Sequence, residues 1–270
     1  MENFIKNLYF DWTLFKAMNF GAWVRLTLSK YKCLFCILVL KKSCTLRVGK
    51  NTMLISSIED LGTTLSSLSD SYYDLKKHIS DARIIIDVGA NIGQFANAAK
   101  YWFPNSKIYS FEPVPEVFEI LQQNMKSFWE SSVQINFWLS DSQWQITFYT
   151  SELSLVSSII KPDHMKSALV LEVNTLDNML GDLEDIDILK IDVEWAELMV
   201  LKWSANVLKR SKYLLIEMSF ERDTNDVKNL DVLMEVRKHC PRAEIFHTGR
   251  KLWWRDLVSA QDFLIKLNNL

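Results

Sequence analysis

Several features that mark common classes of protein are missing from this chain of 270 residues. The longest apolar run, Cys33 to Leu40, has eight residues, whereas a helix that crosses a membrane needs about 20. The chain does not open with a basic region followed by an apolar stretch, which is the pattern of a secretory signal. We therefore expect neither a membrane-spanning helix nor secretion.

Cysteine is scarce, with four residues in the chain. Cys33 and Cys36 form a C-x-x-C pair, but only Cys44 lies near it in sequence, and no histidine does. A structural zinc site needs four ligands. We therefore predict no metal site here and expect reduced thiols that belong to a core. Reduced thiols favour a cytoplasmic location.

Charge of one sign is not in excess over the whole chain, which has 31 Lys and Arg against 33 Asp and Glu. A protein that binds nucleic acid normally shows a basic stripe, and none is evident, so nucleic acid is excluded as a partner. The first 40 residues are rich in Phe, Trp, Leu and Tyr with scattered Lys. Two alternatives remain open for this segment: peripheral contact with a membrane, or packing on the domain or on a second subunit.

The chain divides into an N-terminal extension, residues 1–75, and a domain, residues 76–270. In the extension, residues 1–45 are predicted to be helical with a wide apolar face. Thr45–Val48 and Thr52–Ile55 are typical of a short strand pair around a tight turn. The Ser-rich stretch that follows, residues 63–71, is predicted to be a loop or a helix-capping segment.

From Ile84 onward, predicted strands and helices alternate. Strands are expected at Ile84–Ile86, Ile108–Phe111, Gln134–Leu139, Gln145–Tyr149, Leu169–Val173, Ile186–Ile191, Tyr213–Met218, Ala243–His247 and Phe263–Leu267. Helices are expected at Tyr72–Ile79, before the first of these strands, and at Gln94–Trp102, Pro115–Lys126, Leu176–Leu180, Glu194–Lys202 and Asn229–His239. This alternation predicts parallel βαβ units and an α/β fold with a Rossmann-like, doubly wound, mostly parallel sheet.

The turn after the first of these strands reads D-x-G-x-N-x-G, from Asp87 through Gly89 and Asn91 to Gly93. Glycine allows a sharp turn and a close approach of a ligand, and the helix that follows offers free N–H groups and a positive dipole end. The dinucleotide fingerprint would need glycine at Asn91 and at Gln94, so a nicotinamide-dependent oxidoreductase is disfavoured. The turn instead suits a ligand whose amino-acid part carries an ammonium, which Asp87 can pair with.

An acidic residue also ends the second strand. Glu112 follows Asp87 by 25 residues, near the spacing of about 20 at which an acid accepts the hydroxyls of a ribose. A glycine turn combined with this acid predicts a nucleoside ligand. The alternative is that Asp87 and Glu112 only cap helices.

The domain resembles the FkbM family of methyltransferases over about 160 residues. The matching words, in order, are I-D-V-G-A-N-I-G from Ile86, F-E-P from Phe111, L-S-D from Leu139, T-L-D from Thr175, L-K-I-D-V-E from Leu189, A-E-L from Ala196, L-K from Leu201, and Glu217.

This resemblance implies a class I methyltransferase fold with a seven-stranded, mostly parallel sheet. It also implies transfer of a methyl group from S-adenosylmethionine (SAM) to an oxygen of a sugar, a glycolipid or another small-molecule acceptor. The residues expected to bind SAM are Asp87, Gly89, Asn91 and Gly93 for the methionine part, Glu112 for the ribose and Asp141 for the adenine amino group.

Acidic residues after the Ile186–Ile191 strand are the candidates for chemistry. Lys190, Asp192 and Glu194 alternate, so they share one face of an extended stretch. Asp192 or Glu194 could act as a general base on the acceptor hydroxyl, or hold a divalent cation that acidifies it. Alternatively, Asp192 only orients the SAM ammonium. Glu197 is expected at the surface, and Glu217 at the acceptor pocket.

Glycine is scarce, and tryptophan is frequent. The chain has seven glycines and ten tryptophans, whereas average usage predicts roughly 19 glycines. Trp144, Trp195 and Trp203 stand where the family has glycine, which is the pattern expected if UGA codons that the source organism reads as glycine are translated as tryptophan. UGG codons there would contradict this hypothesis. At Trp203 we expect a left-handed helix end, which costs a residue other than glycine about 1–2 kcal/mol. Because Trp195 would crowd the ligand site, a non-catalytic nucleoside-binding or scaffold protein remains the alternative function.

Overall fold

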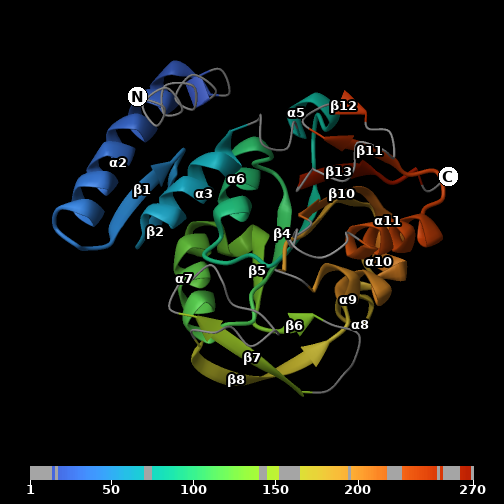
Figure 1. Cartoon of the computed structure of the whole chain (residues 1–270). Coiled ribbons are helices and arrows are strands. Elements are labelled where there is room, and N and C mark those ends of the chain that lie inside the picture. The colour runs from blue at the N-terminus through green and yellow to red at the C-terminus, as the bar shows by residue number, and fades with distance from the viewer. Residues whose placement is uncertain are drawn as a thin grey trace.

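The computed structural model describes residues 14–15, 18–69, 75–139, 145–151, 165–193, 196–217, 227–247, 250–251 and 262–268. A central sheet has the strand order β12-β11-β13-β10-β9-β3-β4-β5 (Figure 1). Its strands are β3 (Ile84–Val88), β4 (Lys107–Phe111), β5 (Ser132–Ile135), β9 (Ile186–Ile191), β10 (Ser211–Glu217), β11 (Glu244–His247), β12 (Arg250–Lys251) and β13 (Asp262–Lys266).

Five neighbouring strands of this sheet, from β5 to β10, run parallel. β13 lies antiparallel between β10 and β11. The two-residue β12 extends the edge beyond these seven strands. The predicted Rossmann-like, mostly parallel seven-stranded sheet is therefore confirmed.

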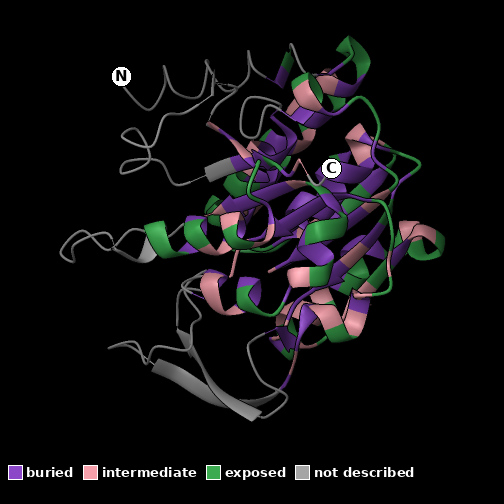
Figure 2. Cartoon of the chain, turned by 90° about the vertical axis from the view of Figure 1, so that its right-hand side faces the viewer, coloured by how far each residue is buried: buried purple, intermediate pink, exposed green. Residues whose placement is uncertain are grey.

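Helices cover both faces of the sheet. α5 (Leu75–His78), α6 (Gln94–Trp102) and α7 (Pro115–Met125) lie on one face, and α8 (Leu176–Leu180), α9 (Glu197–Lys202), α10 (Ala205–Arg210) and α11 (Val227–His239) lie on the other. Successive strand residues point to opposite faces, so Ile85 packs with the first group of helices and Ile86 with the second. Figure 2 shows the result, a buried sheet between helices whose outer turns are exposed.

One predicted strand divides into two. Instead of a single strand at Gln134–Leu139, the structure has β5, which ends at Ile135, and β6 (Trp138–Leu139). Between them, the Asn136 amide donates hydrogen bonds to the carbonyl oxygens of Glu112 (2.8 Å) and Pro113 (2.9 Å). These bonds hold the chain at Asn136 against the residues that follow β4. β6 then joins β7 (Gln145–Ser151) and β8 (Met165–Asn174) in a separate three-stranded sheet.

The N-terminal extension contains α2 (Phe20–Leu38), the antiparallel pair β1 (Cys44–Val48) and β2 (Asn51–Ile55), and α3 (Ile58–Leu68). The strand pair confirms the prediction. The loop predicted over residues 63–71 is wrong because α3 covers most of it. Ser57 and Asp60 form a capping box at the start of α3, and Leu61 and Leu65 bury its apolar face, which together outweigh the loop preference of the serines.

The extension packs on the domain rather than standing apart. Its apolar core includes Ile92 and Ala98 of the domain. Asn124 of α7 accepts a hydrogen bond from the Leu54 N–H of β2 (2.6 Å) and donates one to the Ile92 carbonyl (2.8 Å). The packing alternative is therefore confirmed for the buried side of α2. The boundary at residue 75 stays a prediction.

The thiols behave as core residues. Cys33, Cys44 and Cys240 are buried, Cys36 is half-buried, and all four are free. Burial raises the pKa of Cys33 to about 12 and that of Cys240 to about 11. In the part of the chain that the structure describes, no group of three or more His, Cys, Asp or Glu side chains could hold a metal ion, and no helix is long and apolar enough to cross a membrane. A cytoplasmic location stays a prediction.

Trp203 does not occupy a left-handed helix end. It follows α9 with a φ of −119°, which any residue adopts, so the expected backbone strain is wrong at this position. Trp144 and Trp195 lie outside the described residues. The codon hypothesis for the three tryptophans stays a prediction.

Candidate functional site

The turn after β3 has three residues with positive φ, Gly89 at +79°, Asn91 at +49° and Gly93 at +90°. A Cβ atom on Gly89 would lie 1.7 Å from the carbonyl oxygen of Asp192. The Asp192 N–H also donates to the Val88 carbonyl (3.0 Å). Gly89 is therefore required because the chain leaving β9 passes directly against the turn.

Gly93 is the N-cap residue of α6 and leaves the amino end of this helix open. No side chain among the described residues caps this helix, so its first N–H groups face the turn with the positive end of the helix dipole. A Cβ atom on Gly93 would lie 3.0 Å from Leu121. Asn91 tolerates its left-handed conformation because its side-chain oxygen accepts the Ile92 N–H (2.8 Å).

A buried polar row crosses three neighbouring strands beneath α6. Asp87 of β3 is in register with Lys190 of β9 on one side and with Ser110 of β4 on the other. Residues in register on parallel strands point to the same face, and all three side chains are buried. The Lys190 Nζ lies 5.6 Å from the centre of the Phe95 ring on α6. An otherwise apolar layer therefore contains a charged site.

Asp87 is the least satisfied member of this row. Its side chain is fully buried, and its Oδ1 lies 3.4 Å from the Lys190 Nζ. Neither oxygen accepts a hydrogen bond from a group that the structure describes. Burial raises the pKa of Asp87, and the charge of Lys190 opposes the shift. A cationic donor at this position would supply the partner that the carboxylate lacks.

Lys190 links the two acids at the carboxyl edge of the sheet. Its Nζ donates to the Asp192 Oδ2 (3.0 Å). Burial alone would lower the pKa of Lys190, but Asp192 and Asp87 outweigh this effect and hold it above its ordinary value. The Asp192 side chain is 28% exposed, so a ligand can reach it directly.

Glu112 joins the turns that follow β3 and β4. One oxygen accepts the N–H of Asn91 (3.0 Å), and the other accepts the N–H of Val114 (3.0 Å), the N-cap residue of α7. Burial raises the pKa of Glu112 to about 7, and these hydrogen bonds moderate the shift. Glu112 therefore has a structural role of the capping kind. Each of its oxygens keeps a second lone pair for a ligand.

Most of the predicted residues converge on this edge. Asp87, Gly89, Asn91, Gly93, Glu112 and Asp192 lie at the ends of β3, β4 and β9. Asp141 and Glu194 lie outside the described residues. Glu217 ends β10, and its charge contributes to the raised pKa of Lys190. The surface position expected for Glu197 is wrong, since this side chain is buried.

Two further polar side chains at the site carry little signal in the sequence. The Ser110 Oγ and the Gln94 Nε2 are buried and have no hydrogen-bond partner among the groups described. The register of Ser110 with Asp87 becomes visible only when the two strands are paired. In the sequence, Gln94 stands out only as a position where the dinucleotide fingerprint has glycine.

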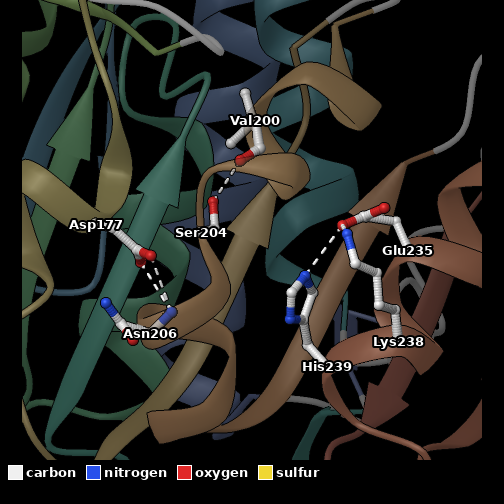
Figure 3. A network of polar contacts seen from close by, with 7 residues as sticks. All are labelled: Asp177, Val200, Ser204, Asn206, Glu235, Lys238 and His239. Atoms are coloured by element: carbon white, nitrogen blue, oxygen red, sulfur yellow. Dashed lines mark hydrogen bonds and ion pairs between the residues drawn. The ribbon is translucent and has the colours of Figure 1, made fainter.

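Asp177, from the T-L-D word, caps a helix on the other face of the sheet. Its carboxylate accepts the N–H groups of Asn206 (3.0 Å) and Val207 (3.0 Å) at the start of α10. Figure 3 shows this cap beside the Ser204 hydroxyl, which bonds the Val200 carbonyl, and the separate Glu235 cluster with Lys238 and His239. Asp177 is therefore a capping residue.

Comparisons with known proteins give one family and several distant relatives. Residues 87–240 match the family model described as the methyltransferase FkbM domain, which is more than half of the chain. Methyltransferase 1 of Beauveria bassiana is 31% identical over 156 residues, which cover 49% of this chain and 62% of that protein. Hexuronic acid methyltransferase AglP of Haloferax volcanii is 26% identical over 149 residues, which cover 54% of this chain and 60% of that protein.

The matched parts thus span about three fifths of the length of these two relatives. Among solved structures, precorrin-6y C5,15-methyltransferase from Geobacter metallireducens is similar at 14% identity and a TM-score of 0.41, over 82% of this chain and 90% of that one.

Proposed function

Because the chain belongs to the FkbM methyltransferase domain family, we propose that it transfers a methyl group from SAM to a hydroxyl oxygen of a sugar, a glycolipid or another small molecule. The observation that carries the SAM assignment is the fully buried Asp87 carboxylate, whose oxygens accept no hydrogen bond from the described groups. The name of the Haloferax volcanii relative, a hexuronic acid methyltransferase, supports a sugar acceptor.

The residues at the carboxyl edge fit SAM in charge. Asp87, Asp192 and Glu112 surround a single ammonium, that of Lys190. SAM carries a sulfonium, an ammonium and a carboxylate, so it brings a net positive charge. A site with more carboxylates than cations attracts such a ligand, and burial strengthens the attraction.

We assign a part of SAM to each residue. Asp87 would bind the ammonium, and the open N–H groups at the start of α6 would bind the carboxylate. Gly89, Asn91 and Gly93 would shape the turn around the methionine part. Glu112 would accept the ribose hydroxyls through its second lone pairs, and Asp141 would accept the adenine amino group.

The proposed chemistry asks for positioning and for the removal of one proton. SAM supplies a methyl group that its sulfonium already activates, so alignment of the acceptor contributes much of the rate. Asp192 is partly exposed at the edge and is oriented by Lys190. Its carboxylate would take the proton of the acceptor hydroxyl as the oxygen bonds to the methyl carbon and the bond from that carbon to sulfur breaks, which leaves the neutral thioether S-adenosylhomocysteine. Glu194 is the second candidate for this base.

Incubation with methyl-labelled SAM and a panel of hexuronic acids, neutral hexoses and glycolipids tests the proposal. We expect label in at least one acceptor. Asp192→Asn should lower kcat by roughly 100-fold or more while SAM still binds, and Asp81→Asn, at an exposed carboxylate, should leave both unchanged. SAM binding without transfer to any acceptor would favour the non-catalytic nucleoside-binding alternative.

A further inference from the structure

α2 has apolar side chains on two opposite sides. Ala22, Leu26 and Cys33 are buried against β1 and α3. The other side, here termed the outer face of α2, is made of residues spaced three or four apart, which therefore line one side of a helix. Its members are Phe20, Val24, Leu28, Tyr31, Phe35 and Leu38.

The outer face lies in solvent. Phe20, Leu28, Tyr31, Phe35 and Leu38 are 54–69% exposed. Of the 14 large apolar side chains that are exposed in the described part of the chain, eight lie between Phe15 and Leu40. Single exposed apolar residues are ordinary, but a contiguous group marks an interaction surface.

The sequence around α2 is strongly basic. Residues 12–58 contain eight Lys and Arg and no Asp or Glu. The whole chain has a net charge of −2. Since this segment contributes +8, the remaining residues together carry −10. The chain-wide balance of acids and bases therefore conceals a basic segment, and the expectation that the chain has no basic stripe is wrong for these residues.

Exposed basic side chains lie on α2 and on the elements next to it. Arg25 and Lys32 are exposed on α2 itself, and Lys41 and Lys42 follow its carboxyl end. Arg47 of β1 is also exposed, and its backbone N–H donates a hydrogen bond to the Ser29 hydroxyl of α2 (2.9 Å). Figure 1 shows α2 at the outer edge of the molecule, with β1 and β2 between it and α3.

We propose that the outer face of α2 binds the surface of an anionic lipid bilayer. Phenyl, phenol and leucyl groups partition into the boundary between headgroups and acyl chains, and Lys and Arg beside them attract anionic headgroups. No described helix is long and apolar enough to cross a membrane, so α2 lies along the surface. A second copy of the chain is a poorer occupant because it would bring another segment of +8 against the first.

This proposal does not depend on methyl transfer, and co-sedimentation with vesicles tests it directly. The probe is vesicles of phosphatidylcholine with roughly 30% phosphatidylglycerol, compared with pure phosphatidylcholine. We expect the chain to sediment with the anionic vesicles at least about tenfold more strongly, and to release when salt shortens the range of charge attraction. Absence of binding to the anionic vesicles would overturn the proposal.

Paired variants locate the surface. Leu28→Ser with Phe35→Ser should lower binding by about tenfold or more. Leu230→Ser with Met234→Ser, which removes two exposed apolar side chains from α11, should leave binding unchanged. Because all four residues are exposed, unchanged circular dichroism and Tm should show that both variants fold.

Two results would overturn the assignment of this surface to lipid. The first is equal vesicle binding by both paired variants. The second is a dimer in sedimentation velocity that dissociates in the Leu28→Ser, Phe35→Ser variant, since a second copy would then occupy the face.

Arg25→Gln with Lys32→Gln should keep the fold, weaken vesicle binding and reduce its dependence on salt.

Discussion

The carboxyl edge of the central sheet and the outer face of α2 depart in opposite directions from the ordinary distribution of side chains. At the carboxyl edge, Asp87, Lys190 and Glu112 bury ionisable groups in the interior. On α2, Phe20 and Leu28 expose large apolar side chains. Figure 2 shows the usual arrangement, with buried strands inside and exposed positions on the outer turns of the helices.

Each departure is costly in the isolated chain and is relieved by a different kind of partner. A buried carboxylate needs a donor or a cation within hydrogen-bond distance, which a small cationic ligand provides. An exposed apolar face with basic neighbours needs an extended anionic layer with an apolar interior, which a bilayer provides. The two departures therefore indicate two different partners, one for the buried carboxylates and one for the exposed apolar face.

The largest expected effect on stability concerns two glycines, one at the carboxyl edge and one in the extension. Gly89→Ala should destabilise the fold by on the order of 3 kcal/mol or more, because Gly89 has a φ of +79° and a Cβ atom there would meet the Asp192 carbonyl. Gly62→Ala, within α3 and with nothing near the added Cβ, should stabilise it by about 1 kcal/mol. Urea unfolding of both variants measures the contrast, and equal stabilities would contradict the geometry of the turn.

Substitution of Asp87 tests whether the buried carboxylate at the carboxyl edge binds a ligand. Asp87→Asn should weaken SAM binding by roughly 100-fold, since removal of one partner from a buried charge pair costs about 2–5 kcal/mol. Lys190 keeps its bond to Asp192 in this variant, so the fold should persist. Asp81→Asn, at an exposed position, is the matched control. Titration of SAM gives both affinities, and an unchanged affinity in Asp87→Asn would remove Asp87 from the site.

A polar side chain with its partners already in place should behave differently from Asp87. Asp177→Ala removes the acceptor for two N–H groups at the start of α10 and should cost about 1–2 kcal/mol of stability. SAM affinity should stay the same, because Asp177 lies on the other face of the sheet. A loss of SAM affinity in a folded Asp177→Ala variant would show that the T-L-D word belongs to the binding site.

Glu112 has backbone hydrogen-bond partners, as Asp177 has, and also lies at the candidate site, as Asp87 does. We therefore expect both stability and SAM affinity to depend on its protonation and hence on pH. Burial raises its pKa from 4.5 to about 7. The folded chain therefore holds a proton that the unfolded chain has lost, and the contribution of Glu112 to stability falls as pH rises through this window. A cationic ligand favours the ionised form, so SAM affinity should rise by up to about tenfold per pH unit until pH about 7.

Calorimetric titrations of SAM across this range measure the dependence on pH. Glu112→Gln should flatten the profile. An equally steep profile in Glu112→Gln would assign the titration to another group, and Asp87, whose pKa is also raised by burial, would be the first candidate.

The smallest expected effect concerns an exposed apolar side chain that stands alone. Trp203 is 50% exposed, and its φ of −119° is not in the left-handed region. Trp203→Gly should therefore change stability by less than about 0.5 kcal/mol and leave vesicle binding unchanged. A stabilisation of 1–2 kcal/mol, seen in thermal unfolding, would indicate the backbone strain of a helix end that requires glycine.

The elements that support the site could be predicted because their signals are local. α6, α8 and β9 have the predicted bounds, since dense β-branched runs, helical periodicity and the breaking effect of Pro and Gly act within each segment. The split of Gln134–Leu139 could not be predicted, because it depends on hydrogen bonds from Asn136 to carbonyl groups of a distant turn. The α10 helix was missed for a similar reason, as Asp177 caps it from 29 residues away.

Within the site, the sequence indicates residue types but not their partners. Asp87 and Glu112 were predicted from their positions at strand ends. The ion pair of Asp87 with Lys190 depends on the pairing of β3 with β9, which strand order alone decides. Likewise, the contact of Gly89 with Asp192 could not be foreseen from either segment. The sequence shows which side chains can bind or ionise. Which partners these side chains find once they are buried depends on how the strands pair in the sheet.

Calorimetric titration of SAM into the unaltered chain, near pH 8, tests the central claim most directly. The account predicts binding at a single site with a dissociation constant on the order of micromolar, because the carboxylates at the edge then meet the cation that they lack. Absence of binding heat, together with an unchanged Tm at millimolar SAM, would contradict it. The buried charges at the carboxyl edge would then need another explanation.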